Sequence, residues 1–237
     1  MISIEAVGGG RNLTYGLLEA VGRSIVNGRF DNKPFPTEAD LAKHYAVSRS
    51  VTREAVKMLT AKGLLVARPR KGTTVQPTRA WNLFDPDVLR WILDRNLSLD
   101  LLRQFNELRM AIEPAAAAIA ARAADRPSIA RIEAGYQRMV AAEAGEDDTL
   151  EADIAFHIAI LEAAGNPFYA QLSDVVTTAL RASIRFTNRY MDTTASLQEH
   201  RAVLTAIEAG DPVAARATME GLIGAVVSVI ADAERAA

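Results

Sequence analysis

Three side chains in the C-terminal half of the chain have types and a spacing that suit a metal ion. Asp153 and His157 are four residues apart in "EADIAFHIAIL", which places both on one face of a helix. His200 lies further along, in "SLQEHRAVL". One carboxylate and two imidazoles form a nitrogen and oxygen ligand set for a divalent ion such as zinc. An Asp and a His at this spacing also form ordinary polar pairs, so the spacing leaves both interpretations open.

A second group of side chains suits contact with nucleic acid. In "VSRSVTREAVKML", Arg49 and Arg53 lie one helical turn apart on the face opposite the apolar positions, with Ser48 and Ser50 near the start. A solvated helix face usually mixes Glu and Lys, whereas this face contains little acid. Guanidinium groups donate paired hydrogen bonds to guanine, so this face is suited to contacting DNA bases.

The elements around these arginines predict a winged helix-turn-helix over residues 1–79. Thr37 and Asp40 form a capping-box pattern at the start of a short helix, and Ser48 provides the cap of the next one. Only a tight turn separates the two helices. Two extended runs, 64–68 and 73–76, then flank a basic turn and predict a β-hairpin wing. In this motif the second helix enters the major groove, which places Ser48, Arg49, Ser50 and Arg53 at the DNA.

The charge distribution agrees with a basic module joined to an acidic one. Residues 1–79 contain 13 basic and 6 acidic side chains, a balance of +7, and the remaining residues carry a balance of −9. All five lysines lie in the first part. This asymmetry is typical of a nucleic-acid binder with a second domain of different function. With no cysteine, no apolar run of membrane length and no secretory signal pattern, we expect a cytoplasmic protein that does not insert into a membrane.

The rest of the chain predicts an all-α antiparallel bundle, so the fold class is mainly α. Residues 80–86 are expected to be a linker, docked by Trp81 and Phe84, and residues 87–237 an effector-binding and dimerisation domain. Helical periodicity is present near residues 87–95, 99–123, 127–144, 148–164, 167–190, 195–209 and 212–233. Arg109 and Glu113 are one turn apart, a spacing that is ordinarily that of a weak surface pair.

Three functions are compatible with these residues. The first is a ligand-responsive regulator that binds a near-palindromic operator as a homodimer. The second is a metal-dependent hydrolase or lyase that uses Asp153, His157 and His200, although no separate general base or nucleophile pair accompanies them. The third is a nonspecific chromosome-binding protein, which would bind phosphates without regard to sequence. Arg49 and Arg53 favour the first function over the third.

The segment "PFPTEADLAKHYAVSRSVTREAVKMLTAKGLLVARPRKGTTV" resembles the DNA-binding domain of GntR-type bacterial transcription regulators. The resemblance covers residues 12 to 78. In the FadR subgroup of this family, the recognition-helix arginines and the wing glycine with its preceding residue contact DNA, which implies roles for Arg49, Arg53, Lys71 and Gly72. The chain has Ala39 where members often carry Arg, so we expect an operator that differs from the usual one.

The C-terminal part resembles the FadR C-terminal ligand-binding domain through "ELRMAIEPAAAAIAA", "DIAFHIAILEAAGNPFY" and "LQEHRAVLTAIEAGD". In many members an Asp and three His bind a metal beneath a cavity for a small carboxylate. Asp153, His157 and His200 match three of these ligands, and Leu222 stands where the fourth is usually His. Further similarity to the sugar-acid-responsive repressors of this subgroup, including those for galactonate, implies repression that the acid relieves. It also implies that the acid's contacts lie among Arg109, Ser196, Arg189 and Tyr190.

Overall fold

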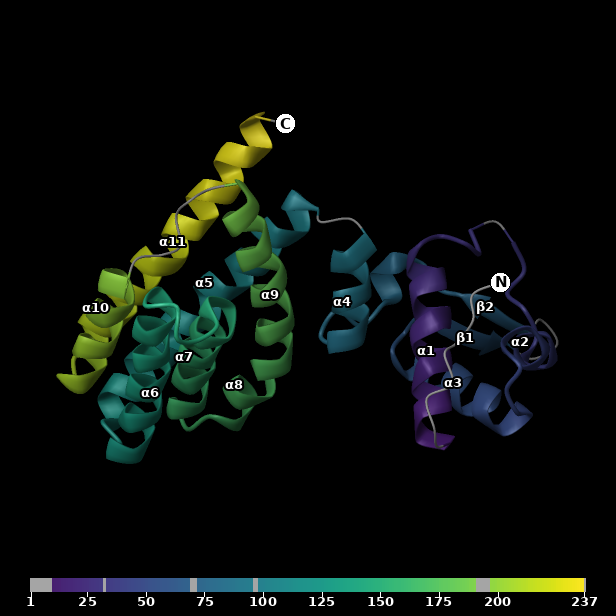
Figure 1. The fold of residues 1–237 in the computed structure, drawn as a ribbon, viewed down its shortest axis with the longest axis horizontal. Coiled ribbons are helices and arrows are strands. Elements are labelled where there is room, and N and C mark those ends of the chain that lie inside the picture. Colours follow the sequence, from purple (N-terminus) through teal and green to yellow (C-terminus); the bar gives the residue numbers. More distant parts are fainter. Residues whose placement is uncertain (1–9, 32, 69–71, 96–97, 191–196, 237) are drawn as a thin grey trace. The chain divides into compact units, whose positions relative to one another are not determined.

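The computed structural model describes residues 10–31, 33–68, 72–95, 98–190 and 197–236 (Figure 1). The chain divides into two compact units, residues 1–96 and residues 97–237. Helices make up most of both units, and the described part contains one two-stranded sheet. The prediction of a mainly α fold is confirmed.

The first unit contains the predicted winged helix-turn-helix. Its elements are α1 (Gly10–Val26), α2 (Glu38–Tyr45), α3 (Arg49–Ala61), β1 (Leu65–Arg68), β2 (Gly72–Val75), η1 (Thr78–Ala80) and α4 (Pro86–Arg95). The two strands are antiparallel, with Leu65 opposite Val75 and Arg68 opposite Gly72, and they form the wing. The core is lined by apolar faces of all three winged-helix helices, including Leu17, Leu41 and Leu59.

Local side-chain hydrogen bonds set the starts of α2 and α3. The Thr37 hydroxyl accepts from the Asp40 amide at 3.2 Å, and the Asp40 carboxylate accepts from the Thr37 amide at 3.2 Å. These reciprocal bonds are the predicted capping box. Ala46 adopts a left-handed conformation with φ 53°, which ends α2 and turns the chain toward the Ser48 cap of α3.

Helix α4 groups with the first unit, whereas the prediction assigned residues 87–95 to the effector domain. Trp91 on α4 is 1% exposed, and its ring lies where a Cβ on Gly22 of α1 would meet it at 2.4 Å. The sequence pattern favoured this helix as part of the effector domain, after a linker. Close packing of the indole on a glycine of α1 instead joins α4 to the winged helix. In the predicted linker, Trp81 packs on the same core as expected, whereas Phe84 is 57% exposed.

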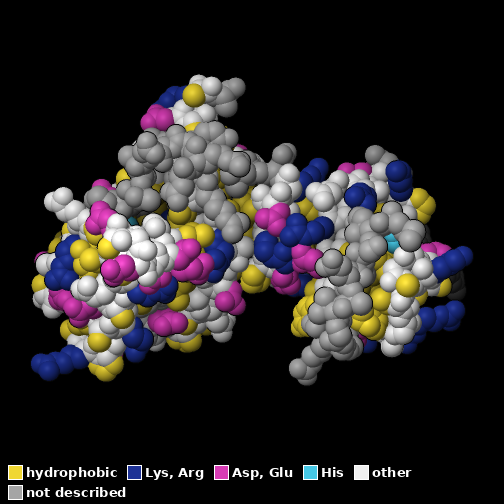
Figure 2. Space-filling model, in the orientation of Figure 1, with side chains coloured by type: hydrophobic (Ala, Val, Ile, Leu, Met, Phe, Trp, Pro, Cys, Tyr) yellow, Lys and Arg dark blue, Asp and Glu magenta, His cyan; other side chains and the backbone are white. Residues whose placement is uncertain are grey.

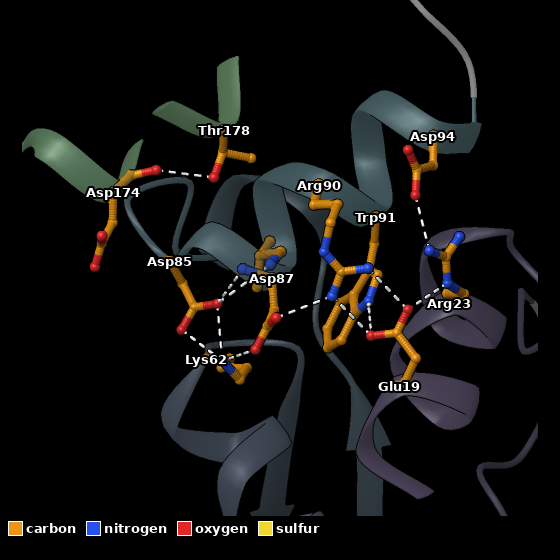
Figure 3. Close-up of polar contacts among 11 residues, drawn as sticks. Glu19, Arg23, Lys62, Asp85, Asp87, Arg90, Trp91, Asp94, Asp174 and Thr178 are labelled. Atoms are coloured by element: carbon orange, nitrogen blue, oxygen red, sulfur yellow. Dashed lines mark hydrogen bonds and ion pairs between the residues drawn. The ribbon is translucent and has the colours of Figure 1, made fainter. Parts of the chain in front are cut away.

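Polar contacts reinforce the packing of α4, and we call this group the α4 anchor (Figure 3). Glu19 of α1 accepts hydrogen bonds from Arg90 at 2.9 and 2.8 Å, from the Trp91 indole at 2.8 Å, and from Arg23. Arg23 also donates to Asp94 at 2.8 Å. At the other end of α4, Lys62 is bonded to two carboxylates. The anchor comprises Glu19, Arg23, Lys62, Asp85, Asp87, Arg90, Trp91 and Asp94.

The second unit is an all-α bundle, as predicted. Its helices are α5 (Leu99–Ala123), α6 (Arg126–Glu143), α7 (Thr149–Ala163), α8 (Pro167–Gln171), α9 (Ser173–Tyr190), α10 (Leu197–Glu208) and α11 (Pro212–Ala236). The single helix predicted for residues 167–190 is two helices, because the backbone amide at Leu172 bonds to the preceding turn before α9 begins. The start predicted at residue 195 lies outside the described residues.

Two long helix pairs organise the bundle, α5 with α11 and α6 with α7. On α6, a Cβ at Gly135 would lie 2.9 Å from the Phe156 backbone of α7. The glycine therefore allows the two backbones to approach closely. Helix α7 brings Asp153 and His157 to the interior, and its contacts with α5 and α9 set the surroundings of these side chains.

Helix α11 is long and apolar enough, by length and composition, to cross a membrane. Its most apolar window has a mean hydropathy of 1.6 and is 28% buried. Such a helix is weak evidence for a membrane span, because core helices of globular proteins also meet this criterion. Here α11 packs along α5 and α10 and buries Met219, Leu222 and Ile223 in the bundle.

Candidate nucleic-acid interface and buried polar site

The first candidate surface is the exposed face of α3. Thr52, Ala55, Val56 and Leu59 form its buried face. Ser48, Arg49, Ser50 and Arg53 are all exposed, as the helical spacing predicted. The Ser48 hydroxyl caps the helix by accepting from the Val51 amide at 3.3 Å, and it lies 2.8 Å from the Ser50 hydroxyl. Figure 2 shows exposed Lys and Arg side chains, in dark blue, on the first unit.

The wing contributes one described residue to the predicted DNA contacts. Gly72 has φ 75°, a left-handed conformation that L side chains rarely adopt. A Cβ there would meet no atom within 4 Å, so the backbone conformation, and not space, requires glycine. Lys71 lies outside the described residues. The open surroundings of Gly72 leave its backbone accessible to a partner.

The second candidate site lies inside the bundle, where the three predicted metal ligands meet. Asp153 and His157 come from α7, and His200 comes from α10. The Nε2 atom of His200 is 3.1 Å from Asp153 Oδ1, and Nε2 of His157 is 3.9 Å from Asp153 Oδ2. One ligand atom from each residue lies within 4.8 Å of the others. Both histidines are buried, and the Asp153 side chain is 18% exposed.

A buried ion pair adjoins these ligands, which corrects the prediction of a surface pair. Arg109 and Glu113 are 2% and 1% exposed. Two contacts join them, from Arg109 Nε to Glu113 Oε1 at 2.6 Å and from Nη2 to Oε2 at 3.2 Å. The same Glu113 oxygen lies 2.7 Å from Nδ1 of His157. If Nδ1 carries the proton and donates it to Glu113, Nε2 keeps a lone pair, 3.9 Å from Asp153 Oδ2 and 3.4 Å from Arg109 Nη2, that a metal ion could use.

The charges in this site lower the pKa of both carboxyl groups. Burial by itself raises the pKa of Glu113, but the adjacent Arg109 and His157 outweigh burial and lower it to about 2. Burial likewise opposes ionisation of Asp153, whereas His157 and His200 lower the pKa of that carboxyl group. Both groups are therefore ionised at neutral pH. An anionic site beside two imidazoles can attract a cation.

Asn106 belongs to the same site, although sequence reasoning missed it. It is fully buried, and its Oδ1 accepts from Arg109 Nη1 at 3.2 Å. Its Nδ2 donates to the Leu102 carbonyl at 2.8 Å and lies 3.5 Å from the Ser183 hydroxyl of α9. The spacing of Asn106, Arg109 and Glu113 repeats one face of a helix, a signal that could have grouped them. We call Asn106, Arg109, Glu113, Asp153, His157 and His200 the buried polar site.

Three of the predicted effector contacts have side chains outside the described residues. Arg189 and Tyr190 lie in the last turn of α9, but their side chains are outside the described residues. Ser196 is also outside them. Leu222 is a buried apolar side chain of α11, so position 222 offers no metal ligand.

Two family models match this chain. A model of the FCD domain matches residues 104–225, which is more than half of the chain, and the model of bacterial regulatory proteins of the GntR family matches residues 16–75. The chain belongs to the GntR family. The match of the FCD domain to 104–225 covers every member of the buried polar site, and the GntR model ends at the last residue of β2. GntR regulators bind DNA operators, and small-molecule effectors bind their FCD domains.

Similarity to individual proteins supports this family assignment. The galactonate operon transcriptional repressor of Escherichia coli K12 is 35% identical over 205 residues, which cover 84% of this chain and 89% of that protein. The uncharacterised regulator YieP of the same strain is 30% identical over 225 residues, covering 94% and 97%. The solved structure of Lar from Listeria monocytogenes has a TM-score of 0.60 at 18% identity, covering 96% of this chain and 99% of that one, and supports the fold alone. The chain is a transcription regulator and not an enzyme.

Proposed function

We propose that this GntR regulator represses genes of sugar-acid catabolism and is released from its operator by a sugar acid such as galactonate. The observation that carries the proposal is the buried polar site, in which a carboxylate and two imidazoles that could hold a cation adjoin a buried arginine. The galactonate repressor of Escherichia coli supports the choice of acid, because it is 35% identical. The protein acts in the cytoplasm, where its operator DNA lies.

The exposed face of α3 supports specific operator binding. Arg49 and Arg53 stand at the start of the helix that enters the major groove in this motif. Each chain carries one such helix, so a homodimer would contact two half-sites about one DNA turn apart. The operator is therefore near-palindromic. A scrambled operator provides the control, since equal affinity for both sequences would favour nonspecific chromosome binding.

Charge balance supports both a divalent metal and a monocarboxylate. Imidazoles that bind a metal are neutral. In that state the positive Arg109 and the negative Glu113 and Asp153 would leave the buried polar site with one excess negative charge. An unbalanced charge is costly inside a protein. A divalent cation on Asp153, His157 and His200 would reverse the excess to one positive charge. One carboxylate would then neutralise it, and water or the acid's own oxygens would complete the metal's coordination.

The contacts of Arg109 favour the metal as the anchor for that carboxylate. Its guanidinium already donates to Glu113 through two nitrogens and to Asn106 through the third. A bidentate grip on an effector would require breaking the pair with Glu113. Arg109 thus supports the site electrostatically, and a cation held by Asp153, His157 and His200 would supply the positive charge for the acid's carboxylate.

The outward face of α11 supports a homodimer of effector domains. Ala217, Gly221, Ala225 and Ser228 are exposed along one side of this helix. A Cβ on Gly221 would meet no atom within 4 Å, so packing inside the chain does not require this glycine. A helical glycine costs about 1 kcal/mol relative to alanine. Close approach of the same helix from a second copy would offset that cost.

Size-exclusion chromatography with light scattering tests this dimer face. Gly221→Arg should shift the protein toward monomer by blocking close approach. Thr205→Arg, at an exposed position of α10, is the matched control and should stay dimeric. A Gly221→Arg protein that remains a dimer would place the interface elsewhere.

Fluorescence anisotropy on labelled DNA from upstream of the gene tests the proposed effector. Galactonate and gluconate carry one carboxylate, and galactarate carries two. We expect one monocarboxylic acid to release the protein and galactarate to act more weakly. Treatment with a chelator should abolish release, and added zinc should restore it. Operator binding that no sugar acid weakens would contradict the effector class and leave the regulator assignment intact.

A further inference from the structure

Lys62 is a lysine of the DNA-binding unit whose side chain is largely buried and paired with carboxylates. It caps the C-terminal end of α3, the helix that carries Arg49 and Arg53, and its side chain is only 13% exposed. Its Nζ lies 2.8 and 2.7 Å from the two carboxylate oxygens of Asp85 and 2.9 Å from Asp87 Oδ2 (Figure 3). An ammonium group has three donors. Three close oxygens can use all of them, which leaves none for a phosphate.

The two carboxylates that hold Lys62 also build the start of α4. Asp85 Oδ1 accepts from the backbone amides of Asp87 at 3.0 Å and Val88 at 3.2 Å, so Asp85 caps the helix. Asp87 Oδ1 accepts from Arg90 at 2.9 Å. Lys62 is therefore bonded to the start of α4 through two carboxylates, Asp85 and Asp87.

The contacts continue from α4 to α1 within the same unit. Arg90 donates to Glu19 of α1, which also accepts from the Trp91 indole. The end of α3, the start of α4 and the middle of α1 are thus joined by one connected set of ion pairs around the buried Trp91 ring. Loss of any of these contacts would change how α3, the DNA-contacting helix, is held against α4 and α1.

We propose that Lys62 is a positioning residue, which locks the C-terminal end of α3 to α4 and so sets the angle at which Arg49 and Arg53 meet the operator. Base contacts depend on this angle, because paired hydrogen bonds to a base edge tolerate little rotation of the helix. Nonspecific binding to phosphates is less sensitive to it. Lys62 therefore controls sequence discrimination without contacting DNA.

Removing the charges of the two partners of Lys62 distinguishes a positioning role from a general effect of charge on DNA binding. In the full chain, Asp85→Asn with Asp87→Asn removes two negative charges near the DNA-contacting helix. Asn still caps a helix as well as Asp does. Added positive charge by itself should tighten binding to every DNA sequence. We expect instead that operator affinity falls roughly tenfold relative to scrambled DNA.

Lys62→Met gives the complementary measurement. It removes the charge and keeps a long apolar stem. Loss of a phosphate contact would lower the slope of log affinity against log salt by about 0.9. We expect the slope to stay unchanged while the ratio of operator to scrambled-DNA affinity falls. Lys57→Met is the matched control, because Lys57 is an exposed lysine of the same helix, with a side chain 66% exposed. It should leave the affinity ratio unchanged.

Two results would overturn the proposal. One is an Asp85→Asn, Asp87→Asn protein that binds operator and scrambled DNA more tightly by the same factor. The other is a Lys62→Met protein whose salt slope falls by about 0.9 with an unchanged affinity ratio, as a phosphate contact requires. Circular dichroism melting identifies any variant that fails to fold. Asp87→Asn alone, which leaves the Asp85 pair in place, then provides the milder test, with the same two readouts.

Discussion

The buried polar site and the α4 anchor use the same kinds of side chain in opposite surroundings. In the buried polar site, Arg109 and Glu113 are 2% and 1% exposed. In the α4 anchor, the side chains of Glu19 and Arg90 are 36% and 38% exposed. Water screens this part of the anchor, so burial of its charges costs little and its ion pairs serve to orient helices. The charges of the buried polar site have no such screening, and we infer that its excess negative charge is there to bind a ligand.

The largest expected effect comes from removing the carboxylate of Glu113. Glu113→Ala leaves Arg109 charged and buried without its partner, which should destabilise the second unit by about 3 to 5 kcal/mol. Both tryptophans, Trp81 and Trp91, lie in the first unit. Urea unfolding followed by circular dichroism should therefore show the loss, and tryptophan fluorescence should not. Equal shifts in both signals would indicate that the two units unfold together.

Arg49→Ala separates a DNA contact from structural support. We expect operator affinity to fall by about 1 to 3 kcal/mol, because a paired hydrogen bond with a base is lost. Arg49 is exposed, so thermal unfolding should be unchanged. Anisotropy titration of the operator measures the first effect and calorimetry the second. Wild-type affinity for the operator would exclude a base contact for this arginine.

Gly22→Ala tests whether α4 is held by close packing as well as by ion pairs. The new methyl group would lie 2.4 Å from the Trp91 ring, so the helices must separate. Overpacking of this kind costs about 1 to 3 kcal/mol. Tryptophan fluorescence should detect the earlier unfolding of the first unit. A matched Ala20→Gly variant tests the general effect of helix propensity at a neighbouring position of α1.

The smallest expected effect is the acid response of the anchor. Burial opposes ionisation of Glu19, but hydrogen bonds from Arg90, Trp91 and Arg23 lower its pKa to about 2 from 4.5. A lowered pKa in the folded state stabilises the protein above pH 4.5, and this contribution disappears as the pH falls from 4.5 toward 2. Because Glu19 is partly exposed, we expect no more than about 1 kcal/mol. Glu19→Gln should flatten this part of the stability profile, measured by tryptophan fluorescence. An unchanged profile would show that other carboxylates account for it.

The predictable parts of the molecule depend on residues that are close in sequence. The capping box at Thr37 and Asp40, the Ser48 cap and the alternation of faces on α3 each involve one or two helical turns. Periodicity alone therefore predicts that Arg49 and Arg53 lie on the exposed face of α3. Residue types suggested grouping Asp153 and His157 with His200, which lies on a different helix, and the family resemblance favoured that grouping.

The unpredicted parts depend on contacts between distant residues. Trp91 packs on Gly22 of α1, far earlier in the chain, and no local pattern distinguishes this arrangement from a helix of the effector domain. Glu113 and Arg109 have the spacing of a surface pair, and only the fold buries them. The division between α8 and α9 at Leu172 contains neither proline nor glycine, so periodicity could not indicate it.

The most direct test of the buried polar site as the effector site compares wild type with His200→Ala on labelled operator, with and without galactonate. His200 is 1% exposed and lies 3.1 Å from Asp153, so its loss removes one of three ligands from the proposed cation. The ratio of operator affinities without and with the acid measures the response. We predict a large ratio for wild type with zinc present and a ratio near one for the variant. A His200→Ala protein that galactonate releases as readily as wild type would contradict the account.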